Sequence, residues 1–399
     1  MRRLQAGRWL AATTAAVVVG SALASCTIGE PQRLEPVAQT TEPTTEEETP
    51  RPPKASVSNG ATDVEPGEPV TISSAAGLTE VTMTNESGGE VKSKLSDDKT
   101  EWTTAEPLGY GRTYSIEAKD TEGQTMKTSF TTVVPSAQVN AYLGPVEESV
   151  VGAAQAVTVR FDYPIEDTKA MEKLINIETS NDTEGGFFWL DPYELRWRPK
   201  EYWEPGTEVK VSIDMYGKKL AEGVYGAADA ETSFTIDDVL TETVVDNNLK
   251  VLRVYKDHEL VKEFPIALGM DGAYDTPNGF YVVGDEHDTL TMDSRTYGLS
   301  LDAGGYITTV NYATQLSYSG IYVHSAPWAI GSIGYTNVSH GCVNATPEDA
   351  KWFMENVRRG DPFEVRYTKG ETLSGYDGLG YWNLDWEQRS GGSKDPNKE

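Results

Sequence analysis

A cysteine and two histidines in the C-terminal part of the chain are side chains of the types that nucleophilic catalysis needs, although the sequence does not give the distances between them. Cys342 lies in the stretch GYTNVSHGCVNAT with His340 two residues before it, and His324 lies eighteen residues upstream in IYVHSAPW. A thiol attacks as its thiolate, and a neighbouring imidazole can lower the thiol pKa and shuttle the proton. The imidazole in turn needs an acceptor on its other ring nitrogen, which fixes its tautomer and orientation.

The residues around Cys342 add two elements that suit a nucleophile. Gly341 allows close approach of the backbone, and nearby amides could hold an oxyanion. A helix is predicted after the cysteine, with Thr346 as N-cap, Pro347 as its first residue and Gly360 beyond its end. Its dipole would favour the thiolate if the thiol points along the helix axis. Its other predicted features are Asp349 at the third position and an apolar stripe of Ala350, Phe353, Met354 and Val357.

Residue chemistry alone leaves two other interpretations of Cys342 open. It could be a buried thiol with no chemical role, because free cysteine is often buried. It could also bind zinc together with His324 and His340, although no CxxC pair or HExxH motif accompanies them. The remaining histidines, His258 at a predicted turn and His287 in GDEHDTL, are expected to be solvated rather than catalytic.

The elements ahead of this site are predicted to be strands. The pattern GRTYSIEAKD followed by KTSFTTV returns as GTEVKVSID followed by ETSFTID, and VEPGEPVTIS and VVGAAQAVTVRF each place a turn before a strand. Tyr114, Ile116 and Ala118 alternate with the period of a strand that has one buried face. Short strands repeated over about 100 residues predict two tandem immunoglobulin-like β-sandwiches, at residues 54–135 and 136–237. They are expected to act as spacers rather than as ligand-binding modules.

Residues 238–368 continue the β-rich pattern and hold the site. Here a hairpin in KVLRVYKDHELVKEFPIALGM is predicted to turn at Lys256-Asp257, and further strands are expected in YDTPNGFYVVG and YSGIYVHSA. Residues 369–390 carry Trp382, Leu384 and Trp386 and are expected to pack back onto the protein. Residues 391–399 are expected to be disordered.

The N-terminus has the pattern of a bacterial lipoprotein. Residues 1–25 combine early arginines with a short apolar stretch, and they end in Leu23-Ala24-Ser25 before Cys26, which resembles a lipobox. Cys26 would then carry lipid; the alternative is an ordinary signal peptide in which Cys26 is incidental. Residues 26–53 are rich in Pro, Thr and Glu and predict a disordered spacer. With Cys26 acylated, Cys342 would have no disulfide partner and would remain a free thiol. The lipid would anchor the protein to the outer face of the cytoplasmic membrane, within the cell envelope.

Charge excludes one class of partner. The 399-residue chain has a formal net charge of −28, whereas binding of nucleic acid needs clustered Lys and Arg.

The segment HSAPWAIGSIGYTNVSHGCVN resembles the signature of the L,D-transpeptidases, which is a histidine, fourteen residues, Ser-His-Gly-Cys, one residue and an asparagine. Here His324, residues 325–338 and the run from Ser339 to Asn344 match without a gap. The similarity extends through MDSRTYG, YATQLSYSGIYVHSAPW and the Trp-rich tail, and it includes the two predicted immunoglobulin-like domains. It points to the mycobacterial and corynebacterial lipoprotein members, whose YkuD-type catalytic domain is a β-sandwich of its own kind with a short helix.

The resemblance implies a role for individual residues. Cys342 would be the nucleophile, His324 its base, and the backbone carbonyl of Ser325 would orient the imidazole. Tyr306 corresponds to a tyrosine that the family places beside the oxyanion in the substrate pocket. Pocket, lid or substrate-contact positions are implied for Met292, Tyr297, Trp328, Ser319, Gly320, His340 and Asn344. For the aromatic residues only the resemblance supports this role, since a Tyr or Trp in a β-domain usually belongs to the core.

The reaction that the resemblance implies is peptidoglycan cross-linking, and thus cell-wall biogenesis and maintenance of cell shape. Cys342 would attack the tetrapeptide stem, release D-alanine, and pass the acyl group from its thioester to a diaminopimelate amine, giving a 3→3 cross-link. Neither a metal nor an organic cofactor is expected, and carbapenems are expected to acylate Cys342. Two alternatives remain, an L,D-carboxypeptidase that uses water as acceptor and a non-catalytic wall-binding scaffold.

Overall fold

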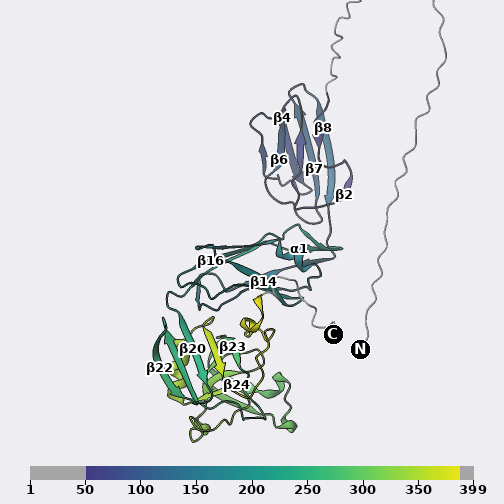
Figure 1. Cartoon of the computed structure of the whole chain (residues 1–399). Helices are drawn as coiled ribbons and strands as arrows, with labels where there is room; N and C mark the ends of the chain where they lie inside the picture. Colours follow the sequence, from purple (N-terminus) through teal and green to yellow (C-terminus); the bar gives the residue numbers. More distant parts are fainter. Residues whose placement is uncertain (1–50, 387–399) are drawn as a thin grey trace, which may run out of the picture. The chain divides into compact units, whose positions relative to one another are not determined.

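The computed structural model describes residues 51–386 (Figure 1). The predicted export signal, the lipidation site at Cys26, most of the spacer and the last residues of the tail lie outside this part of the chain. Within it, strands dominate, and the predicted mainly β architecture with a short helix after the cysteine is confirmed. No helix in residues 51–386 is long and apolar enough to cross a membrane.

The first sandwich pairs two four-stranded sheets, in the orders β1-β3-β6-β5 and β2-β8-β7-β4. Its strands are β1 (Lys54–Ala55), β2 (Ala61–Val64), β3 (Thr71–Ser73), β4 (Leu78–Asn85), β5 (Ser93–Leu95), β6 (Glu101–Thr104), β7 (Thr113–Asp120) and β8 (Thr125–Thr132). Along β7 every second residue is buried, so Tyr114, Ile116 and Ala118 enter the core as their alternation predicted.

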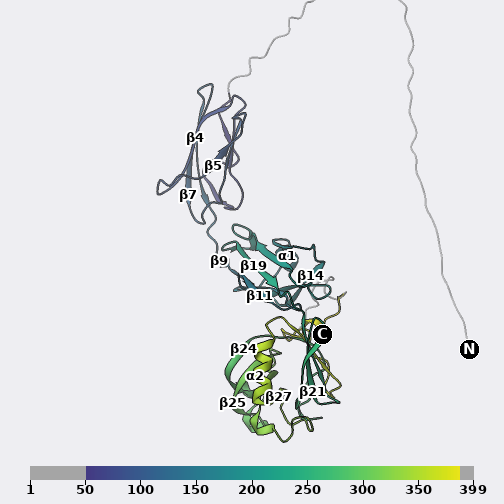
Figure 2. The same ribbon diagram turned by 90° about the vertical axis from the view of Figure 1, so that its left-hand side faces the viewer.

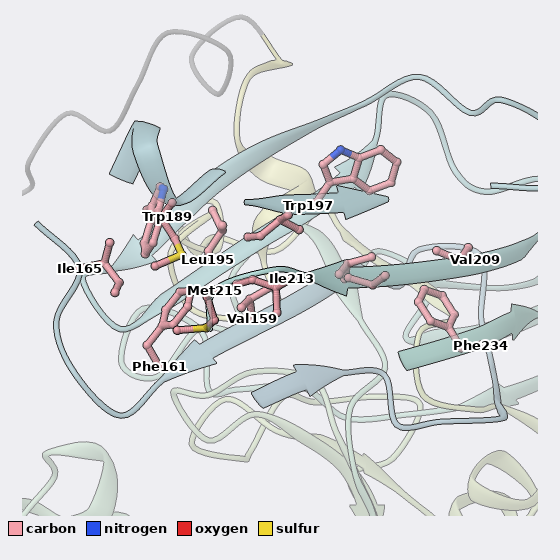
Figure 3. Close-up of a cluster of buried hydrophobic side chains, with 14 of the residues drawn as sticks. Val159, Phe161, Ile165, Trp189, Leu195, Trp197, Val209, Ile213, Met215 and Phe234 are labelled. Carbon is pink, nitrogen blue, oxygen red and sulfur yellow. The ribbon is translucent and has the colours of Figure 1, made fainter. Parts of the chain in front are cut away.

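The second sandwich has a separate core between the sheets β10-β12-β15-β14 and β11-β19-β16-β13. Its elements are β9 (Ala137–Val139), β10 (Ala141–Gly144), β11 (Ser149–Val151), β12 (Val157–Phe161), α1 (Thr168–Glu172), β13 (Ile175–Thr179), β14 (Gly185–Asp191), β15 (Glu194–Pro199), β16 (Glu208–Ile213), β17 (Lys219–Ala221), β18 (Val224–Gly226) and β19 (Ala230–Ile236). Figure 3 shows Trp197, Phe161 and Phe234 among the side chains that fill this core. The repeated sequence pattern forms the antiparallel pairs β7–β8 and β16–β19.

The third core lies between a five-stranded sheet, β22-β21-β20-β28-β23, and a four-stranded sheet, β24-β25-β26-β27. Its strands are β20 (Thr241–Asp246), β21 (Val251–Lys256), β22 (Glu259–Pro265), β23 (Gly279–Val282), β24 (Glu286–Asp293), β25 (Ile307–Gln315), β26 (Tyr322–Ser325), β27 (Val343–Ala345) and β28 (Pro362–Arg366). Its helices are η1 (Ser294–Tyr297), η2 (Leu301–Ala303), η3 (Pro327–Ala329) and α2 (Pro347–Asn356), and η4 (Tyr381–Asn383) follows in the tail.

The hairpin between β21 and β22 corrects one prediction. Lys256 still pairs with Glu259, so the two turn residues are Asp257 and His258, and the predicted turn at Lys256-Asp257 is wrong by one residue. Both turn residues have positive φ, 50° and 66°, as the favoured two-residue hairpin turn requires. His258 is solvated as predicted, with its ring 3.0 Å from the Glu242 carboxylate and its side chain 77% exposed.

Helix α2 packs against the four-stranded sheet through Ala350 and Phe353, and Figure 2 shows it beside β25 and β27. Its start is the one predicted. The Thr346 hydroxyl accepts the Asp349 N–H at 3.1 Å and donates to the Asp349 carboxylate at 2.7 Å. This reciprocal cap fixes the chain only a few residues beyond Cys342.

Replacing Thr346 by alanine is expected to lower the free energy of unfolding by about 1 kcal/mol, because the N-cap acceptor is lost. Urea unfolding followed by circular dichroism measures this change. Thr346→Ser keeps an oxygen in place and should lose much less. Equal stability of the alanine and serine variants would show that the cap is not stabilising.

The tail from residue 369 to 386 returns to the second sandwich. The Tyr381 hydroxyl accepts the Ala156 N–H at 2.9 Å and donates to the Ala154 carbonyl at 2.8 Å. The indole N–H of Trp382 donates to the same Ala154 carbonyl, and the Arg198 guanidinium lies 3.8 Å from the Trp382 ring centroid.

Candidate active site

Two neighbouring strands bring His324 and the Cys342 loop together. β26 and β27 pair in parallel, with His324 opposite Asn344, and Cys342 directly precedes β27. Their side chains share a cleft of about 270 Å³. The cleft is lined by Met292, Tyr306, Thr308, His324, Trp328, Val338, Ser339, His340, Cys342 and Asn344.

His324 is arranged as a neutral base. Its ring is buried, with only 4% of the residue exposed, and Nδ1 lies 2.9 Å from the Ser325 carbonyl oxygen. Because a carbonyl can only accept, Nδ1 carries the proton and Nε2 keeps its lone pair. Burial lowers the pKa of His324, and the Ser325 carbonyl opposes this only in part, so the ring is uncharged at neutral pH.

Cys342 is a buried free thiol. Its Sγ lies 3.5 Å from the Gly320 carbonyl oxygen, to which the S–H donates. Burial raises the pKa of Cys342 to about 11, against a smaller lowering by a hydrogen bond from the Tyr322 backbone. Cys342 is therefore a thiol at neutral pH, because burial outweighs the Tyr322 hydrogen bond.

Tyr306 stands beside the thiol as a hydrogen-bond donor. It is half-buried, and burial together with the neighbouring Cys342 and Tyr297 raises the pKa of Tyr306 to about 12. The phenol therefore keeps its proton at neutral pH. A protonated hydroxyl at this position can donate to an oxygen that becomes negatively charged during attack by Cys342.

Ser319 and Gly320 do not line the cleft but belong to the loop that faces Cys342. Asp377 in the tail accepts the N–H groups of Tyr318 and Ser319, at 2.8 and 3.0 Å. At Gly320 φ is 95°, and a Cβ there would overlap the ring of Tyr297. Only glycine fits this contact, which places the Gly320 carbonyl against the thiol.

His340 and Asn344 both line the cleft. The His340 ring packs between Tyr274 and Tyr306, with centroid distances of 4.2 and 5.0 Å, and its Nε2 lies 3.1 Å from the Gly304 carbonyl oxygen. Asn344 is 2% exposed, and its side-chain carbonyl oxygen has no hydrogen-bond partner within residues 51–386.

Of the other predicted pocket residues, Met292 and Trp328 line the cleft. Met292 is buried beneath the cleft, whereas Trp328 is 60% exposed at its rim. Tyr297 lies outside the lining, with its hydroxyl 3.5 Å from that of Tyr322.

Three residues that sequence reasoning did not assign also belong here. Thr308 and Val338 line the cleft, and the Tyr322 backbone contacts the Cys342 thiol. Period two along β26 could have indicated Tyr322, because it lies on the same face as His324. No local signal marks Thr308 or Val338.

Zinc binding by His324, His340 and Cys342 finds no support. Among the described residues, no group of three or more His, Cys, Asp or Glu side chains could hold a metal ion.

Comparisons with known proteins agree with this geometry. Residues 241–365 match the family model for the L,D-transpeptidase catalytic domain, and residues 61–219 match the model for a bacterial Ig domain. The chain is 44% identical over 302 residues to L,D-transpeptidase 2 of Mycobacterium tuberculosis (strain CDC 1551 / Oshkosh), covering 74% of each protein. The chain belongs to the L,D-transpeptidase family. The resemblance carried by the His324–Asn344 segment is thereby confirmed, and the protein is an enzyme.

Other relatives extend this result. L,D-transpeptidase 5 of M. tuberculosis (strain ATCC 25618 / H37Rv) is 33% identical over 304 residues, which is 73% of this chain and 65% of the relative. Among solved structures, LdtMt1, an L,D-transpeptidase in complex with imipenem, superposes with a TM-score of 0.50 and 35% identity. That similarity covers 58% of this L,D-transpeptidase and 100% of LdtMt1.

Proposed function

We propose that this L,D-transpeptidase joins two peptidoglycan stem peptides by a 3→3 cross-link, with Cys342 as nucleophile and His324 as base. The observation that carries this proposal is the fixed tautomer of His324. Its Nδ1–H is held by the Ser325 carbonyl, so Nε2 is left as a proton acceptor in the cleft that also contains the Cys342 thiol.

The first half-reaction forms a thioester. His324 Nε2 takes the thiol proton as Sγ attacks the carbonyl carbon between residues three and four of a tetrapeptide stem. The carbonyl oxygen becomes negatively charged, and the Tyr306 hydroxyl donates to it. When the carbonyl re-forms, the C–N bond breaks, and D-alanine leaves with the proton that His324 returns to its nitrogen.

The second half-reaction transfers the acyl group. The side-chain amine of diaminopimelate on a neighbouring stem attacks the thioester, and His324 accepts the proton that the amine loses. The C–S bond then breaks, and His324 returns a proton to Sγ.

Product analysis tests the proposal. A soluble fragment that begins at Lys54 is incubated with purified disaccharide-tetrapeptide, and the products are followed by mass spectrometry. The expected result is release of D-alanine together with a cross-linked dimer. Release of D-alanine without dimer would assign the enzyme to the carboxypeptidases. If the folded protein forms neither product, the non-catalytic wall-binding scaffold is the alternative that is left.

The pH dependence of acylation follows from the two pKa shifts. Carbapenems such as imipenem are expected to acylate Cys342, which requires neutral His324. Because burial lowers the His324 pKa from its ordinary 6.5, protonation stops the reaction only below about pH 6.5. The acylation rate constant should therefore be nearly level between about pH 7 and 9 and fall on the acid side. Intact-mass kinetics measure it, and an acid limb centred at or above pH 6.5 would contradict the assignment of His324 as the base.

We also propose that Cys26 anchors the enzyme by lipid to the outer face of the cytoplasmic membrane, with residues 26–53 as a spacer. The lipobox-like run from Leu23 to Cys26 supports this. In cells that express the full chain, wild-type protein should partition into detergent and Cys26→Ala into the aqueous phase. Identical partitioning would reject the anchor.

A further inference from the structure

The buried threonine of YDTPNG lies beneath the catalytic loop. Thr276 has 0% exposure, and its hydroxyl makes two hydrogen bonds at once. It accepts the N–H of Gly269 at 3.0 Å and donates to the backbone carbonyl of Gly341 at 2.8 Å. One side chain therefore connects the segment after β22 to the residue that precedes Cys342.

Close packing leaves this region little freedom. At Gly341 φ is 121°, a conformation that favours glycine. A Cβ on Gly269 would collide with the Tyr274 carbonyl and would approach the Gly341 Cα to 2.9 Å. The backbone around Gly269, Tyr274 and Gly341 is therefore closely packed around the Thr276 hydroxyl. This packing fixes the direction from which the hydroxyl donates to the Gly341 carbonyl.

The direction of the Gly341 carbonyl sets the direction of the next amide. In a planar trans peptide the C=O and the following N–H point in opposite directions. The Cys342 N–H therefore points away from Thr276. Ser339 holds the flanking groups, because its hydroxyl accepts the Gly341 N–H at 3.1 Å and donates to the Cys342 carbonyl at 2.7 Å. The Cys342 N–H itself donates to no group within residues 51–386.

We propose that Thr276 is a positioning residue that orients the Gly341–Cys342 peptide, so that the Cys342 N–H donates to the oxyanion formed when Sγ attacks a carbonyl. This inference rests on the proposed function of Cys342. Thr276 touches neither the substrate nor the thiol and acts only through the peptide that it fixes. A donor fixed before the reaction is effective because it does not need to reorganise as charge develops.

Two reagents separate oxyanion stabilisation from thiol reactivity. Imipenem acylates a thiol through an oxyanion, whereas iodoacetamide alkylates it by displacement at a saturated carbon and forms none. The full-length chain is compared with Thr276→Val, which keeps the shape and removes the hydroxyl, and with Thr276→Ser, which keeps the hydroxyl. Intact-mass spectrometry gives both rate constants, and Cys342→Ala controls for labelling elsewhere.

The expected result for Thr276→Val is a roughly 10- to 100-fold lower rate constant with imipenem, while that with iodoacetamide stays within about threefold. Thr276→Ser should restore the imipenem reaction to within about threefold of wild type. Parallel slowing with both reagents, or no slowing with either, overturns the role of Thr276. If iodoacetamide alkylates wild-type Cys342 but imipenem never acylates it, the result contradicts the proposed role of Cys342 as an acyl-accepting nucleophile. The positioning role of Thr276, which depends on that role, is then rejected as well.

Discussion

Replacing Cys342 by alanine is expected to lower the rate of D-alanine release from a tetrapeptide stem by at least about 10⁴-fold. The reason is that the acyl-enzyme cannot form without Sγ, and Cys342 is the free cysteine of the described chain. His324 and Tyr306 remain in the variant, but they can only assist slow attack by water. The measurement is D-alanine release and dimer formation with disaccharide-tetrapeptide, quantified by mass spectrometry.

The same variant should fold normally, which makes the loss interpretable. Removing Sγ deletes one buried atom and its 3.5 Å contact with the Gly320 carbonyl, so the expected loss of stability is about 1 kcal/mol. Thermal melting provides the control. Cross-linking by Cys342→Ala at more than about one-hundredth of the wild-type rate would place the nucleophile elsewhere.

The features that the sequence predicts correctly are encoded by residues that lie close together along the chain. His324 and the run from Ser339 to Asn344 predicted the site through their resemblance to the L,D-transpeptidase signature, and the fold places both on two adjacent parallel strands or directly before one. Alternating apolar and polar residues predict the strands of the sandwiches, since this period of two is a local property of each strand. The cap of α2 is also local, and Thr346 and Asp349 are only three residues apart.

Long-range contacts are what the sequence could not supply. Thr276 meets Gly341 across 65 positions, and Asp377 in the tail reaches Ser319 across 58. Such contacts depend on how distant segments pack, and no local pattern records them. The raised pKa of Cys342 could not be predicted for the same reason, because its cause is burial by residues from many parts of the domain.

The raised pKa of Cys342 and the lowered pKa of His324 are consistent with one mechanism of proton transfer. A thiol with a pKa near 11 is a poor nucleophile at neutral pH unless its proton is removed during attack. A buried neutral imidazole with a lowered pKa is available to do so, because it is not already protonated. The site therefore favours proton transfer during attack over a standing thiolate.

His324→Gln is accordingly expected to slow acylation of Cys342 by roughly 10²- to 10⁴-fold near neutral pH. Glutamine is uncharged and retains an amide that can donate to the Ser325 carbonyl, but it cannot accept a proton. The thiol must then lose its proton to solvent, so the rate of the variant should rise about tenfold per pH unit until it nears the Cys342 pKa of about 11. Wild type should stay level over most of this range, because His324 supplies the base.

The slope with pH is therefore the decisive quantity, and intact-mass kinetics with imipenem measure it. His258→Gln is a matched control, since that ring is solvated and paired with Glu242 at a hairpin turn. It should behave like wild type at every pH. If His324→Gln is slow but as level with pH as wild type, another group deprotonates the thiol. His324 would then serve only to shape the cleft, and the fixed Nδ1 tautomer would have no catalytic meaning.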